Sequence, residues 1–250
     1  LTNDVGNWFR EQVEAHPEAK WRIALVHKNI FSGSGHQEDE ETPLFRATML
    51  PIMKECEIDV MLQGHDHCYE IIGPVDPDTR TPILSAIEGV EDVPVNMVNN
   101  MTGKKGGTFT TNDGTLYFIG ATCGTKRYQP NHKLTMEADY EKHKVENYYD
   151  LFTGMFGQPG RPSYSTFTVD GNTITVNSYK VYEGMDPMLF NTFHIKRTKE
   201  HGTTISLSKI IEQRGAAKII YNGNMYILRE DIAYNALGQV VAEEDILSKL

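Results

Sequence analysis

The chain has few cysteines, no long apolar run and no excess of positive charge, and each shortage argues against a class of protein. Its 250 residues include three cysteines, Cys56, Cys68 and Cys123, and no CxxC spacing. This count argues against a disulfide scaffold and against a cysteine-rich zinc site. No segment approaches the ~20 apolar residues of a membrane-spanning helix. The formal charge of −10 argues against a nucleic-acid-binding surface, which is usually basic.

Enough apolar residues are present to form a packed core. Hydrophobic residues make up 39% of the sequence, and the length suits one large domain or one domain with an appendage. The negative charge does not exclude phosphate substrates, because bound divalent cations can supply the local positive charge. We expect Cys68 to be a small buried residue rather than a metal ligand.

Histidines follow two of the predicted strands. One apolar run ends at Gly64 and is followed by His65 and His67, and a second run, residues 22–26, ends in His27. Neutral imidazole is the commonest transition-metal ligand at physiological pH. In an extended segment, residues i and i+2 point to the same side, so His65 and His67 could face one metal cluster together. The pattern predicts a metal site at one edge of a sheet.

The order of predicted elements is typical of an α/β protein. Periodicity and capping residues predict helices at 3–15 and 42–56 and strands at 22–26, 59–62 and 116–119. His36 lies in a Gly- and Ser-rich loop between the first strand and the second helix. We expect residues 74–114 to be mostly irregular and residues 136–149 to be helical. Alternating residues predict a hairpin at 164–182 and a further strand at 190–196.

The segment Gly64-His65-Asp66-His67, together with the strand-end His27 and the loop residue His36, resembles the C-terminal half of calcineurin-like metallophosphoesterases, in the purple-acid-phosphatase-like branch. The resemblance covers roughly residues 1–197. It implies the C-terminal half of a four-layer αββα sandwich. It also implies that His27, His65 and His67 ligate a two-metal centre of iron, zinc or manganese ions, divalent or trivalent, and that His36 contacts the substrate phosphate.

The activity implied is hydrolysis of phosphate monoesters or diesters. The family's other ligands come from DxH, GDxxD and GNH motifs, and none of these occurs in the sequence. We therefore expect the chain to be an inactive back half, whose partner is either a missing N-terminal half or a second copy in a homodimer. The alternative is a non-catalytic secreted or cell-surface module derived from a phosphoesterase.

Some roles stay open at the level of sequence. His36 could be catalytic or a flexible surface residue, and Asp66 could orient a ligand histidine or cap the loop. Residues 198–250 differ in character and contain a predicted hairpin around Asn222-Gly223. This β-rich tail resembles C-terminal segments of some secreted bacterial proteins, which favours a secreted, periplasmic or cell-surface location.

Overall fold

The computed structural model describes residues 2–93, 103–130 and 148–201, together with four short strands between residues 216 and 241. The chain divides into two compact units, Leu1–His201 and Gly202–Leu250. Sequence had led us to expect domains of 1–197 and 198–250. Each unit is described by itself.

The first unit contains a mixed five-stranded sheet that carries the histidines. Its strand order is β1-β2-β6-β3-β7. Strands β1, β2 and β6 run parallel, whereas β3 and β7 are antiparallel to their neighbours. The bounds of these strands are β1 Ile23–Leu25, β2 Val60–Gln63, β6 Thr115–Gly120, β3 Tyr69–Val75 and β7 Phe156–Gly157.

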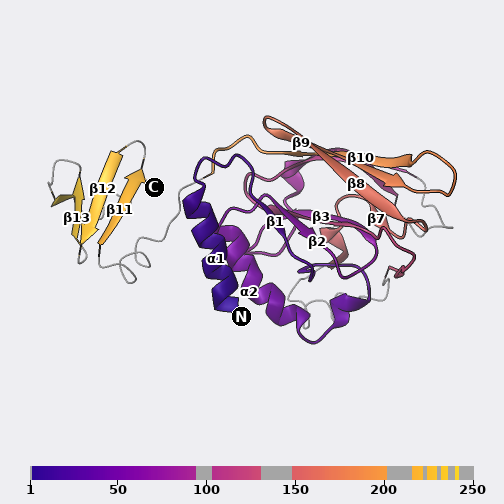
Figure 1. Ribbon diagram of the computed structural model, residues 1–250, viewed down its shortest axis with the longest axis horizontal. Helices are drawn as coiled ribbons and strands as arrows, with labels where there is room; N and C mark the ends of the chain where they lie inside the picture. The colour runs from indigo at the N-terminus through magenta and orange to yellow at the C-terminus, as the bar shows by residue number, and fades with distance from the viewer. Residues whose placement is uncertain are drawn as a thin grey trace. The chain divides into compact units, whose positions relative to one another are not determined.

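Two helices cover one face of this sheet, as Figure 1 shows. They are α1 (Thr2–Ala15) and α2 (Thr42–Glu55), close to the ranges predicted from sequence. Pro43 lies in the first turn of α2, where the missing N–H costs nothing. Phe9 and Met53 of the helices join Met61 and Tyr117 of the sheet in one buried cluster.

A second five-stranded sheet packs on the opposite face of the first. Its order is β4-β5-β10-β9-β8, and Phe193 and Ile195 of β10 share a buried cluster with Ile71 and Phe118 of the first sheet. The described residues thus form three layers, helix, sheet and sheet (Figure 1), and confirm the predicted α/β class. The strand bounds are β4 Ile87–Asp92, β5 Lys104–Thr110, β10 Met188–Lys196, β9 Thr173–Lys180 and β8 Ser163–Asp170.

The expectation that residues 74–114 are mostly irregular was wrong. Strands β4 and β5 lie in this segment, and β3 extends to Val75. Periodicity missed them because β4 and β5 are glycine-containing and largely polar, with only Phe109 fully buried. Their pairing is supplied from far along the chain, since β5 runs parallel to β10. The predicted hairpin is confirmed as β8 and β9, and the later strand as β10.

Short helical turns and a second unit complete the described chain. The predicted helix at 136–149 falls largely outside the described residues. In the second unit β11 and β12 pair antiparallel, which confirms the predicted hairpin, and β13 and β14 extend the sheet. No described helix is long and apolar enough to cross a membrane. The remaining bounds are η1 Gly35–Glu38, η2 Leu84–Ala86, η4 Tyr148–Leu151, β11 Ala216–Tyr221, β12 Asn224–Arg229, β13 Ile232–Asn235 and β14 Val240–Val241.

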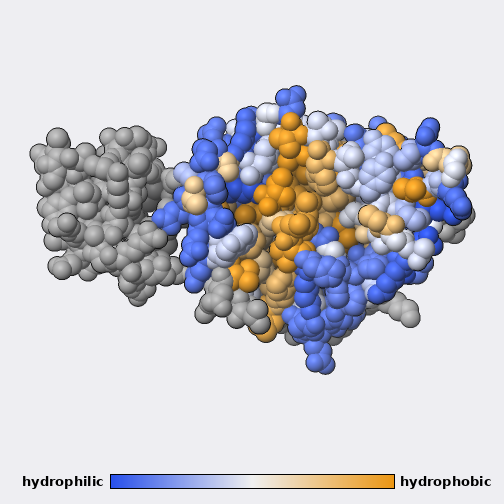
Figure 2. All heavy atoms as spheres, in the orientation of Figure 1, coloured by the Kyte–Doolittle hydropathy of each residue, from blue (hydrophilic) through white to orange (hydrophobic). Residues whose placement is uncertain are grey.

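Strand β1 forms one edge of the first sheet. Among the described residues it pairs with β2 alone. Ala24 is buried in the cluster under the helices, so Ile23 and Leu25 point to the opposite face, where they are 44% and 82% exposed. Figure 2 shows an apolar stripe on the side of the molecule where β1 is seen in Figure 1.

Candidate metal centre

Parallel pairing of β1 and β2 brings His27 and His65 together. Leu25 lies opposite Leu62, and each strand ends two residues before its histidine. The Nδ1 atom of His65 lies 3.3 Å from Nε2 of His27. Gly64 allows this approach, because a Cβ there would lie 3.2 Å from Nδ1 of His27.

The backbone at His65 departs from the extended geometry expected from sequence. Strand β2 ends at Gln63, and His65 has a φ of 69°. A positive φ is uncommon for a residue other than glycine, and such residues concentrate at functional sites. Because the segment turns at His65, the i and i+2 rule does not hold, and His65 and His67 make different contacts.

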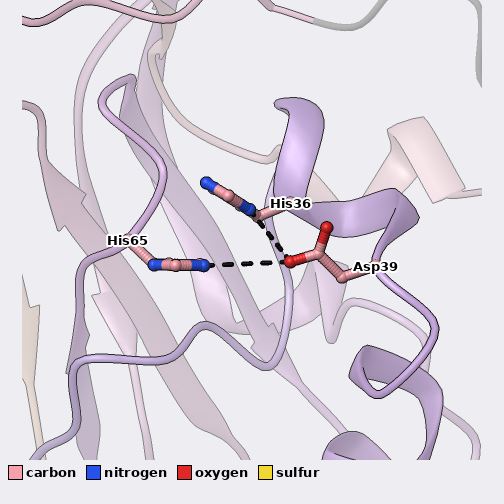
Figure 3. A group of neighbouring side chains, drawn as sticks. All are labelled: His36, Asp39 and His65. Carbon is pink, nitrogen blue, oxygen red and sulfur yellow. Dashed lines mark hydrogen bonds and ion pairs between the residues drawn. The ribbon is translucent and has the colours of Figure 1, made fainter.

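His36 and Asp39 complete a cluster with His65 (Figure 3). His36 lies on η1, and Asp39 is the first residue after η1. The Nδ1 atom of His36 is 2.9 Å from Oδ2 of Asp39, and Nε2 of His65 is 3.8 Å from the same oxygen. The rings of His36 and His65 lie with their centroids 3.6 Å apart. All three side chains are about 30% exposed.

Asp39 was not among the site residues predicted from sequence. The signal that could have found it is its position three residues after His36, since one turn of 3₁₀-helix brings residues i and i+3 together.

His67 stands next to this cluster and is held in one tautomer. Its Nδ1 lies 3.1 Å from the carbonyl oxygen of Lys126, which can only accept, so Nδ1 carries the hydrogen. The Nε2 lone pair is then available to a metal, which is the usual arrangement for ligand histidines. The ring of His67 stacks on Tyr128, with centroids 4.7 Å apart.

Tyr128 links His67 to His36 and was not predicted from sequence. Its hydroxyl oxygen lies 3.4 Å from Nε2 of His36. The main chain at Tyr128 is held in place by two hydrogen bonds. Its carbonyl accepts from Nε2 of Gln158 at 2.7 Å and from Sγ of Cys68 at 3.3 Å. Cys68 is fully buried, as expected, and burial raises the pKa of its thiol.

Two buried carboxyl groups anchor the loop that carries His36. Asp66 accepts from the backbone N–H of His36 at 3.2 Å and from the hydroxyl of Ser32. Glu70 accepts from the N–H of Gly33 at 3.2 Å, and its carboxyl oxygen lies 3.0 Å from the same Ser32 oxygen. Of the two roles open for Asp66, these contacts support capping of the loop.

Burial and neighbouring charges shift the pKa values of His65 and Glu70. Burial and the neighbouring His36 and His27 lower the pKa of His65, which favours the neutral imidazole that binds metals. Burial and the charge of Asp66 raise the pKa of Glu70 well above its usual range, although hydrogen bonds from Gly33 and Ser32 oppose the shift.

The donor set fits a transition-metal ion. One donor atom from each of His36, Asp39 and His65 lies within 4.8 Å of the others. Mixed imidazole and carboxylate donors suit zinc, iron and manganese. The site residues predicted from sequence therefore divide into two groups: His27, His36 and His65 lie together, and His67 is connected to them through Tyr128.

The class defined so far is an α/β protein with a histidine-rich centre at the carboxyl ends of parallel strands. No established family profile matches the chain. Curated relatives do resemble it locally, and all three are from Arabidopsis thaliana. Purple acid phosphatase 3 is 40% identical over 62 residues, which cover 25% of this chain and 16% of the relative. Purple acid phosphatase 4 is 37% identical over 54 residues, covering 22% and 15%.

Purple acid phosphatase 17 is 31% identical over 72 residues, covering 29% of this chain and 20% of the relative. A solved structure of a purple acid phosphatase from yellow lupin seeds overlaps 80% of this chain and 31% of its own, with 15% identity and a TM-score of 0.48. The predicted resemblance to purple acid phosphatases is thus confirmed over part of the chain, and the matched segments span about a fifth or less of the curated relatives.

Proposed function

We propose that this chain forms part of a metal-dependent phosphoesterase that hydrolyses phosphate monoesters or diesters. The observation that carries the proposal is the gathering of His27, His36 and His65 at one end of the first sheet, with His67 joined to them through Tyr128. These histidines come from separate segments, and local sequence similarity to purple acid phosphatases supports phosphoester chemistry for the chain.

In this proposal His27, His65 and His67 hold a two-metal centre of iron, zinc or manganese. Such ions, when bound, supply a nucleophile at neutral pH and neutralise charge on the phosphoryl oxygens. His36 hydrogen-bonds the phosphoryl group or protonates the leaving alkoxide. Asp39 orients the His36 ring through Nδ1, which leaves Nε2 directed toward Tyr128.

The described donors do not complete two metal sites. Near the histidines the described chain offers the carboxylate of Asp39, and the DxH, GDxxD and GNH motifs are absent from the sequence. We therefore propose that the chain alone has negligible activity. The remaining ligands would come from another polypeptide segment, either a preceding part of the protein or a second copy.

The exposed edge of β1 supports this second segment. Among the described residues β1 pairs on one side only, and Leu25, two residues before His27, is 82% exposed. An unpaired sheet edge is a ready template for a further strand. Light scattering of the purified chain tests the point. We expect the chain to self-associate, and we expect this association to be lost when the preceding segment is supplied. A monodisperse monomer would argue against a second segment at the β1 edge.

We further propose a secreted, periplasmic or cell-surface location, for which the resemblance of the tail 198–250 to C-terminal segments of secreted bacterial proteins is the support. Fractionation of the source cells, followed by immunodetection, would check the location. Recovery of the protein in the cytosolic fraction alone would contradict it.

The activity itself is tested by His67→Ala in the intact protein. We expect loss of phosphatase turnover with an unchanged circular dichroism spectrum. The substitution removes a metal ligand, whereas the backbone carbonyl of residue 67 can still accept a hydrogen bond from Gln158. His16→Ala, a change of a largely exposed histidine, is the matched control. Undiminished turnover by a folded His67→Ala protein would refute the proposal. Absence of turnover in the metal-loaded wild-type protein would favour the non-catalytic module.

A further inference from the structure

We infer that His36, Asp39 and His65 form a binding site for one divalent transition-metal ion that this chain fills alone. The site differs from the proposed set of His27, His65 and His67, because it replaces His27 and His67 with His36 of η1 and with Asp39, the residue after η1. It rests on the proposed function to the extent that His65 is a ligand in both.

Two of the three donor-atom separations are close to those expected around a single ion, and the third is below 4.8 Å. Bonds of about 2.0–2.1 Å at tetrahedral angles place two donor atoms roughly 3.4 Å apart. Oδ2 of Asp39 lies 2.9 Å from Nδ1 of His36 and 3.8 Å from Nε2 of His65, so the two observed separations bracket that value. Side-chain movements of about half an ångström would bring these two separations to that value. Figure 3 shows both rings directed at the Asp39 carboxylate.

The turn that carries two of the ligands is fixed by its own hydrogen bonds. The N–H of Asp39 donates to the carbonyl of His36 at 3.3 Å, and the hydroxyl of Thr42 donates to the same carbonyl at 3.0 Å. The N–H of Thr42 donates to the carbonyl of Asp39 at 3.1 Å, and the N–H of His36 is held by Asp66. Binding therefore orders little backbone, which favours affinity.

The third ligand is oriented by a neighbour. His65 directs Nδ1 toward Nε2 of His27 at 3.3 Å and Nε2 toward Asp39. A hydrogen on Nδ1 would be donated to His27 and would leave the lone pair of Nε2 for the ion. His67, by contrast, has its ring on Tyr128 and its Nδ1 on the carbonyl of Lys126.

Two imidazoles and one carboxylate on one side of an ion leave the remaining positions open to water or an anion. Such an ion would lie beside Nε2 of His36 and the hydroxyl of Tyr128, within the same cluster. The site can therefore bind an oxyanion such as phosphate as an additional ligand.

Zinc binding to the full 250-residue chain tests the inference. Isothermal titration and elemental analysis should give one Zn²⁺ per chain. Asp39→Ala should weaken binding by more than about 100-fold, since loss of even a supporting residue costs 10–100-fold. Asp78→Ala, which removes an exposed carboxylate paired with Lys54, is the matched control and should bind as the wild type does. Circular dichroism and thermal unfolding confirm that each variant is folded.

His67→Ala separates the two ligand sets. On this inference it weakens Zn²⁺ binding by the chain less than Asp39→Ala does. The inference is overturned if Asp39→Ala binds Zn²⁺ as tightly as the wild type, if His67→Ala loses as much affinity or more, or if the folded wild-type chain binds no Zn²⁺. Turnover by the intact protein is a separate measurement, so binding through Asp39 without phosphatase activity would sustain this site and refute the proposed function.

Discussion

Replacing Glu70 by glutamine should make the stability of the chain less dependent on pH. The Glu70 carboxyl is fully buried beneath the loop that carries His36. Burial and the nearby charge of Asp66 raise its pKa well above the usual range, and the hydrogen bonds from Gly33 and Ser32 oppose this only in part. In the folded chain the group therefore holds its proton to a higher pH than it does in the unfolded chain.

The sign and size of the effect follow from proton linkage. A group whose pKa is raised by folding contributes stability fully below its unfolded pKa, about 4.3 for glutamate, and loses it as pH rises toward the folded pKa. Between these two values, the free energy of unfolding falls by at most about 1.36 kcal/mol for each pH unit. Glutamine does not titrate, and it keeps an oxygen that can accept from the N–H of Gly33.

Urea unfolding of wild-type and Glu70→Gln chains at several pH values between 5 and 8 measures the difference directly. The variant should gain stability relative to the wild type as pH rises. Glu88→Gln, on the exposed strand β4, is the control and should follow the wild type. Parallel pH profiles for Glu70→Gln and wild type would show that the buried carboxyl is not protonated by folding, and the argument would fail.

Two further changes test other parts of the unit. His201 is buried beside Asp59 and Glu57, within ion-pair distance although not aligned as a good hydrogen bond; burial lowers its pKa, but the two carboxylates outweigh burial and raise it. A raised histidine pKa stabilises the folded state below about pH 6.5, and this gain disappears as pH rises through the folded pKa. In thermal unfolding, His201→Gln should therefore lower the free energy of unfolding by on the order of 1–3 kcal/mol at pH 5 and by less at pH 8. An equal cost at both pH values would contradict this. Tyr128→Phe keeps the ring on His67 but removes the hydroxyl near His36. Turnover of the intact protein should therefore fall about tenfold or more, with unchanged thermal stability. Full turnover would show that the hydroxyl is not used.

The parts of the fold predicted from sequence are those whose signal is local. The helices α1 and α2 have apolar periodicity and clear boundaries, and the hairpin β8–β9 has alternation around a turn at Gly171. Strands β4 and β5 failed because their stability comes from pairing. Gly106 and Gly107 give β5 no alternation to detect, and its partner β10 lies far along the chain.

The same distinction separates the predicted and unpredicted parts of the candidate site. His27 and His65 could be placed together because carboxyl ends of parallel strands meet at one edge of a sheet. Tyr128 could not, because its loop is held near His36 and His67 by contacts with Gln158 and Cys68, which give no local sequence signal. The left-handed backbone at His65 was also unpredictable from a motif that reads as a strand end.

Metal binding and coverage of the β1 edge should be coupled. Among the described residues, the short strand β1 is paired on one side only, and it holds His27 next to His65. A segment that pairs with the other edge would restrict His27 and cover Leu25, so it would strengthen any site that depends on these histidines. Linkage then requires the metal to strengthen binding of that segment by the same factor, and each factor of ten corresponds to about 1.4 kcal/mol. If such a segment binds, the affinity measured for the chain alone is therefore a lower limit on the affinity of the complex.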